Sequence, residues 1–170
     1  TPGAFDTTFE GGQDGFVAKL TPDGSTLVYS TFLGGSLPEE VWDIAVTMDG
    51  CAVIVGTTNS TDFPVTAGVV QPVKSPGLQY DGFVTVIDPT GSSLVWSTYF
   101  GGASSADIYA VTVTSDGEPV VTGRCGAGSG CTTIPRRRSR RRSRARGRPS
   151  PRVRRAWPCR GGSGPAPGSG

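Results

Sequence analysis

The residues of this chain that could do chemistry are carboxylates, cysteines and arginines, because the sequence contains no histidine. That absence excludes a Ser/His/Asp triad, a Cys/His pair and any imidazole metal ligand. The sequence also lacks a phosphate-cradling glycine loop with its lysine, and it lacks a nucleophile elbow. We therefore predict that the chain is not an enzyme, and we predict no cofactor and no metal site.

Four cysteines, Cys51, Cys125, Cys131 and Cys159, form no CxxC pair, so their spacing does not favour a zinc site. Cys125 and Cys131 enclose a short glycine-rich segment and could be joined by a disulfide in an oxidising compartment. Cys51 begins an apolar run, and we interpret it as a small buried hydrophobic residue.

Aspartates recur at a fixed spacing, each followed by glycine: Asp14 with Asp81, and Asp49 with Asp116. Carboxylates in loops can bind Ca²⁺ where several of them converge with carbonyl oxygens. The Asp-Gly pairing is explained equally by turn formation, since glycine adopts positive φ without strain. We interpret these residues as turn residues.

Arginines gather at one end of the sequence. Residues 136–170 hold 13 arginines and no acidic residue, whereas residues 1–135 hold all 14 acidic residues and a net charge near −11. Such a segment cannot build a core and is predicted to be a disordered tail. It would bind nucleic acid or another anionic surface by displacing counterions. The candidate contacts are Arg136, Arg137, Arg138, Arg140, Arg141, Arg142, Arg144 and Arg146.

A second interpretation of the arginine-rich segment stays open. Arginine, glycine, proline and alanine make up 27 of its 35 residues, and all four use GC-rich codons. A shift of reading frame in a GC-rich gene would produce this composition and would interrupt the preceding pattern abruptly. Residues 136–170 are then not in the native frame.

An internal repeat in the sequence predicts the secondary-structure elements that carry these residues. The stretch DGFVAKLTPDGSTLVYSTFLGG (14–35) matches DGFVTVIDPTGSSLVWSTYFGG (81–102) at a shift of 67 residues, with 13 of 22 positions identical. The same shift carries VWDIAVTMDG (41–50) onto IYAVTVTSDG (108–117). TPGAFDT, at the start, matches TAGVVQP (66–72) at a shift of 65.

Each period contains four runs that alternate like strands, at 42–47, 52–57, 82–87 and 94–100. Asp49-Gly50 and Asp116-Gly117 are predicted to be two-residue hairpin loops. Residues 58–80 are predicted to be a long surface loop. Four antiparallel strands per period in an all-β chain are typical of a β-propeller blade, and a solenoid is the alternative architecture.

The phrases DGFVAKLTPDGSTLVYSTFLGG, IAVTMDG and VGTTNSTDFPVTAGVVQ resemble the bacterial seven-bladed β-propeller repeat, or SBBP repeat, over residues 1 to about 123. The resemblance implies a secreted or cell-surface bacterial protein without catalytic residues. It also implies the order of strands in a blade, with 41–47 innermost and 94–100 outermost. The chain begins at Thr1, and a signal peptide is not visible.

This phasing predicts a half blade at 1–40, a full blade at 41–102 and a half blade at 103–135. The ring is incomplete, so we expect the open sheet edges to promote self-association. Repeated aromatic positions are interpreted as packing between blades: Phe16, Tyr29, Phe32, Phe83, Trp96 and Tyr99. No apolar run is long enough to span a membrane.

The predicted function is a structural or interaction module that presents loops such as 58–80 to a protein or carbohydrate partner. The alternative is polyanion binding through the arginine-rich tail. A third hypothesis is an enzyme in which loops of the intact parent protein line a central pocket.

Overall fold

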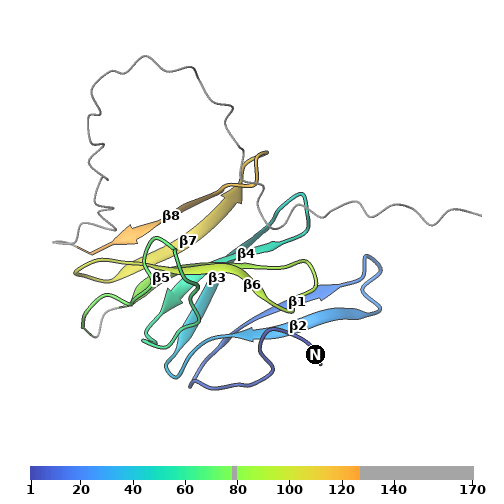
Figure 1. Ribbon diagram of the computed structural model, residues 1–170, viewed down its shortest axis with the longest axis horizontal. Coiled ribbons are helices and arrows are strands. Elements are labelled where there is room, and N and C mark those ends of the chain that lie inside the picture. The colour runs from blue at the N-terminus through green and yellow to red at the C-terminus, as the bar shows by residue number, and fades with distance from the viewer. Residues whose placement is uncertain (78–79, 127–170) are drawn as a thin grey trace, which may run out of the picture.

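The computed structural model describes residues 1–77 and 80–126, and this part of the chain is all-β (Figure 1). It contains eight strands and no helix. The strands are β1 (Gly15–Leu20), β2 (Leu27–Leu33), β3 (Glu39–Val46), β4 (Ala52–Thr58), β5 (Asp81–Ile87), β6 (Leu94–Phe100), β7 (Ala106–Val113) and β8 (Pro119–Cys125).

The strands form three antiparallel sheets. The central sheet has the order β3-β4-β5-β6, and β1-β2 and β7-β8 form two-stranded sheets. The four strand runs predicted for one period therefore form one sheet, each within three residues of its expected bounds. The repeat carries β3, β4 and β6 onto β7, β8 and β2 with a shift of 67 residues in each case.

The middle strands β4 and β5 of the central sheet are buried on both faces because a two-stranded sheet packs against each face (Figure 1). Every residue of β4 and β5 is buried, including alternate positions that point to opposite faces. Ile54 and Phe83 face the β1-β2 sheet, and Val53 and Val84 face the β7-β8 sheet. This double burial explains why the apolar run of β4 is continuous instead of alternating.

The hairpin connections after β3 and β7 are longer than the two residues predicted. Gly50 N–H donates to Thr47 O (2.9 Å), and Thr47 N–H donates to Cys51 O (3.0 Å). Thr114 and Gly117 repeat this pattern in the β7-β8 hairpin. Gly50 and Gly117 have φ of 87° and 85°, so glycine is needed where the turn rejoins the strand.

In the described part of the chain, no helix is long and apolar enough to cross a membrane.

Candidate functional site

The long loop between β4 and β5, of which the structure describes residues 59–77 and 80, lies along the outer edge of β6. We call it the outer-edge loop. Tyr99 N–H donates to Gln71 O (3.1 Å), and Thr66 N–H donates to Ser97 O (3.0 Å). Ser97 N–H in turn donates to the Thr66 hydroxyl (3.1 Å). The loop thus satisfies backbone groups that an edge strand leaves open, and it is not the free surface excursion that its composition suggests.

The segment 1–6 covers the edge of β2 in the same way. Phe32 N–H donates to Asp6 O (3.1 Å), and Ser30 N–H donates to the Thr1 hydroxyl (3.1 Å). Thr1 and Asp6 are the counterparts of Thr66 and Gln71 at the shift of 65 residues found in the sequence. The repeat therefore includes the cover of its own outermost strand.

Gln71 and Asp81 fasten the outer-edge loop to the central sheet. The Gln71 amide donates to Asp81 Oδ2 (3.0 Å), and its oxygen accepts from Gly101 N–H (2.9 Å). Asp81 Oδ2 also accepts from Ser75 N–H (2.7 Å). The Asp81 side chain is fully buried and packs against Gly101, where no Cβ would fit. Asp81, the first residue of β5, is therefore a fastening point for the loop.

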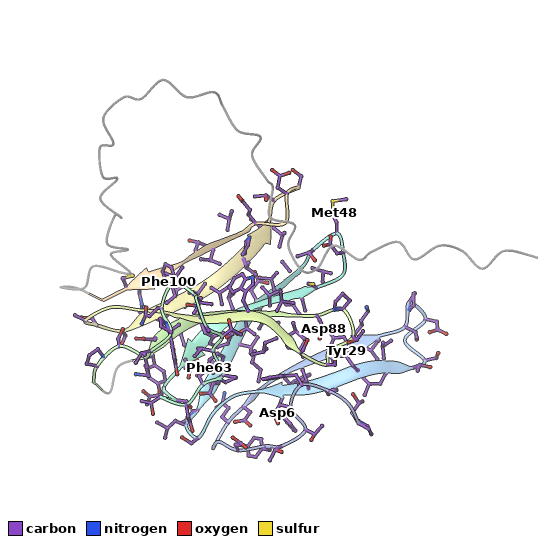
Figure 2. All side chains as sticks on the ribbon, in the orientation of Figure 1. Asp6, Tyr29, Met48, Phe63, Asp88 and Phe100 are labelled. Carbon is purple, nitrogen blue, oxygen red and sulfur yellow. The ribbon has the colours of Figure 1, made fainter. Side chains whose placement is uncertain are left out.

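Phe63 anchors the near end of the loop in the core (Figure 2). Its ring lies 4.5 Å from that of Phe83 and 6.0 Å from that of Tyr99, measured between centroids. The far part of the loop instead exposes three apolar side chains, Val70, Val73 and Tyr80. A loop that is fastened to the sheet and exposes apolar side chains is a candidate contact surface in the described residues.

A buried carboxylate, Glu39, is the first residue of β3 in the central sheet. Glu39 Oε1 accepts hydrogen bonds from the hydroxyls of Thr58 (2.7 Å) and Ser60 (2.5 Å), and Oε2 accepts from Gly35 N–H (3.0 Å). Burial raises the pKa of Glu39, with a smaller contribution from the Asp14 carboxylate, although the three hydrogen bonds act in the opposite direction. Every carboxylate oxygen has a partner from this chain, which indicates a structural role.

The recurring aspartates do not converge into a metal site. Asp14 accepts from the N–H groups of Glu10 (2.9 Å) and Gly11 (3.1 Å), so it holds the segment before β1 as Asp81 holds the segment before β5. Asp49 and Asp116 lie in the hairpin turns. Among residues 1–77 and 80–126, no group of three or more His, Cys, Asp or Glu side chains could hold a metal ion.

The prediction for the repeated aromatic residues is confirmed for Tyr29, Phe83 and Tyr99, which are buried between the central sheet and the β1-β2 sheet. Phe32 and Trp96 are half-buried. The prediction is wrong for Phe16, which is 67% exposed although its counterpart Phe83 is 0% exposed. Phe16 alternates with Val17, which is buried against the central sheet, so its side chain lies on the opposite face of the β1-β2 sheet.

Sequence reasoning missed an aromatic pair on the edge strands β3 and β7. The rings of Trp42 in β3 and Tyr109 in β7 meet edge to face with centroids 5.8 Å apart. They are counterparts in the repeat, and each lies at a β-bulge. The adjacent Asp43 carboxylate accepts from Val111 N–H (2.8 Å) and so links the two strands. The only signal in the sequence was that both positions are aromatic.

The cysteines and the arginines are the remaining predicted site residues. Cys51 is fully buried as predicted, and Cys51 and Cys125 are each disulfide-bonded, not free thiols. Cys131 lies outside the described residues, so its pairing with Cys125 stays a prediction. The arginines at 136–146 lie outside them as well, and polyanion binding stays a prediction.

Compared with protein-family models and with curated proteins, the sequence matches none.

Proposed function

We propose that the chain is a non-enzymatic structural and interaction module of a secreted or cell-surface bacterial repeat protein, and that its sheets are one blade and two half blades of a β-propeller. The observation that carries the proposal is that the same packing contact recurs at both interfaces between sheets. Val41 of β3 packs against Gly15 of β1, and Ile108 of β7 packs against Gly82 of β5. Both pairs are related by the 67-residue shift.

Because the same contact joins both pairs of neighbouring sheets, it indicates how each further sheet would stack on the one before it. Gly15 and Gly82 leave no room for a Cβ, so the innermost strand of each sheet lies directly against the sheet before it. A further period that obeys the rule would stack in the same orientation. Stacking by a constant rotation produces a propeller if the rotation closes the ring and a solenoid if it does not.

The outer-edge loop is the part of each blade that we propose to meet a protein or carbohydrate partner. Its fastening through Gln71, Asp81 and Phe63 holds Val70, Val73 and Tyr80 in fixed positions at the surface. Fixed side chains lose little entropy on binding. The disulfide-bonded state of Cys51 and Cys125 fits an oxidising, extracellular compartment. Polyanion binding through residues 136–170 is the alternative.

The proposal is tested by repeating residues 41–107 in tandem until the chain carries about seven four-stranded sheets, as in common propellers. Small-angle X-ray scattering is then measured for each length. We expect the radius of gyration to stop increasing when the ring closes. A radius that keeps increasing in proportion to the number of repeats would instead identify a solenoid and overturn the propeller architecture.

A further inference from the structure

Two strand edges in the described residues lack the protection that the others have. The outermost strands β2 and β6 are covered by residues 1–6 and by the outer-edge loop. The innermost strands β3 and β7 carry bulges, which interrupt edge pairing. β1 and β8 have one hydrogen-bonded neighbour each, and in the described part of the chain no covering segment and no extra residue interrupts their free edge. The register shift between β1 and β2 places its extra residue, Val28, in β2.

These two edges are complementary halves of one interface already present in the molecule. β7 and β8 correspond to β3 and β4, while β1 and β2 correspond to β5 and β6, at the 67-residue shift. In the central sheet, β4 pairs with β5 along its whole length. Each chain therefore carries a second copy of both strands of the β4-β5 ladder, namely β8 and β1. These two strands belong to sheets on opposite sides of the central sheet, so they cannot pair within one molecule.

We propose that β8 of one copy of this chain pairs with β1 of a second copy, and so completes a four-stranded sheet in the order β7-β8-β1-β2. The proposal rests on the blade architecture proposed above and adds the partner that the open edges bind. The register follows from the central sheet. The pair Ile54 and Thr85 predicts Val121 opposite Ala18, and the pair Gly56 and Phe83 predicts Gly123 opposite Phe16.

The backbone of both edges is oriented for this ladder. Thr21 N–H donates to Thr26 O, and residues alternate in an antiparallel ladder, so Phe16 and Ala18 direct their backbone groups to the free edge of β1. Thr114 N–H donates to Glu118 O, so Val121 and Gly123 do the same in β8. Pro119 lacks an N–H group, which removes one bond at the end of the ladder and leaves those of Val121 and Gly123.

The side chains fit the same pairing. Gly56 receives the ring of Phe83, because a Cβ on Gly56 would lie 2.8 Å from Phe83 Cζ. Gly123 is the counterpart of Gly56, and the exposed Phe16 is the counterpart of Phe83. Leu20, 58% exposed, corresponds to the fully buried Ile87 on the same face. The pairing would thus cover the two large apolar side chains that β1 leaves exposed.

The interface joins different surfaces of the two copies, so it propagates head to tail. Such an interface yields a closed ring if the rotation between copies closes, and an open filament if it does not. Each added copy contributes one central sheet and one shared sheet. Association should therefore depend on concentration.

The test is a double variant of the full chain, Lys19→Cys with Val120→Cys. These residues correspond to Val86 and Val53, which pair in the central sheet, and they lie on opposite sides of one molecule. Mild oxidation should give covalent dimers and higher multiples of the 17.5 kDa chain, with a 19–120 linkage identified by mass spectrometry. The control Lys19→Cys with Val121→Cys moves one thiol to the opposite face and should link poorly.

A second variant keeps the test independent of the introduced thiols. Phe16→Asp should reduce the 19–120 linkage and the association seen by sedimentation equilibrium about tenfold, the order expected for losing burial of one aromatic side chain. Met48→Asp, at another exposed apolar residue, should leave both unchanged. A chain that stays monomeric without the linkage, or associates equally after Phe16→Asp, would overturn the proposal.

The tandem-repeat experiment separates this result from the blade proposal. If the lengthened chains close into rings but the 19–120 linkage fails, the blade architecture stands and only the pairing between copies is wrong.

Discussion

At the scale of single residues, glycines and carboxylates at repeated positions have different structural roles, because their neighbours differ. Gly24 and Gly91 are counterparts in the β1-β2 and β5-β6 hairpins, with φ of 70° and 74°. A Cβ on Gly24 would meet nothing within 4 Å, whereas a Cβ on Gly91 would overlap the ring of Tyr29. Figure 2 shows Tyr29 near Asp88, at the start of this turn.

The two glycines allow the cost of backbone strain to be separated from the cost of lost packing. Gly24→Ala should lower the free energy of unfolding by about 1–2 kcal/mol, the cost of a left-handed alanine. Gly91→Ala should lower it by about 1–3 kcal/mol more, because the Tyr29 ring must move. Urea denaturation of both variants measures the difference. Equal losses would show that Tyr29 does not hold the turn.

Glu39 makes stability depend on pH in the direction opposite to most carboxylates. Because burial raises its pKa in the folded state, the folded chain holds this proton more tightly than the unfolded chain. Stability from Glu39 is therefore fully present below the ordinary pKa of glutamate and is lost as pH rises through the raised value. Asp23 and Asp88, whose pKa values are lowered to about 2, act in the opposite sense.

Glu39→Gln should remove this dependence, because the amide can accept from Gly35 N–H and donate to the hydroxyls of Thr58 and Ser60. The free energy of unfolding of the variant, minus that of the wild type, should increase from pH 4 to pH 7, about the range in which a perturbed glutamate titrates. Urea denaturation at several pH values measures it. A difference that does not change with pH would contradict the raised pKa.

At the scale of elements, each outermost strand is covered by the segment that precedes its hairpin. The pairing is made by backbone groups and short polar side chains, such as Thr66 and Thr98, so it is weakly encoded in hydrophobic pattern. Gln71 is central because its side chain bonds both Asp81 and Gly101. The outer-edge loop is thereby part of the sheet's structure.

Gln71→Ala should release the loop from β6 while leaving the core intact. We expect faster hydrogen exchange at Tyr99 N–H, which donates to Gln71 O, by about fivefold or more, corresponding to about 1 kcal/mol of lost local stability. Val73→Ala, at an exposed position of the same loop, is the matched control. Unchanged exchange at Tyr99 would show that the backbone contacts hold the loop without the Gln71 side chain.

At the scale of the whole molecule, burial is decided by which sheets have neighbours. β4 and β8 are counterparts with similar sequences, yet β4 is buried throughout and β8 is mostly exposed. The β1-β2 sheet covers one face of the central sheet only in part, so Ile44 and Val46 of β3 stay exposed. The proposed pairing between copies and the proposed ring of longer repeats both rest on this stack.

The sequence by itself determined the strands and their order within a sheet, because a two-residue alternation and a 67-residue repeat are local properties of the chain. It also located the loop at 58–80 and matched residues 1–7 to residues 66–72, but the structure alone showed that these segments cover the edges of β2 and β6. Only the tertiary structure decided which counterparts are buried. Phe16 and Phe83 share the local sequence DGFV, but one is exposed and the other lies in the core. The contact of Trp42 with Tyr109 likewise requires two sheets to stack, since burial depends on neighbours that local sequence does not specify.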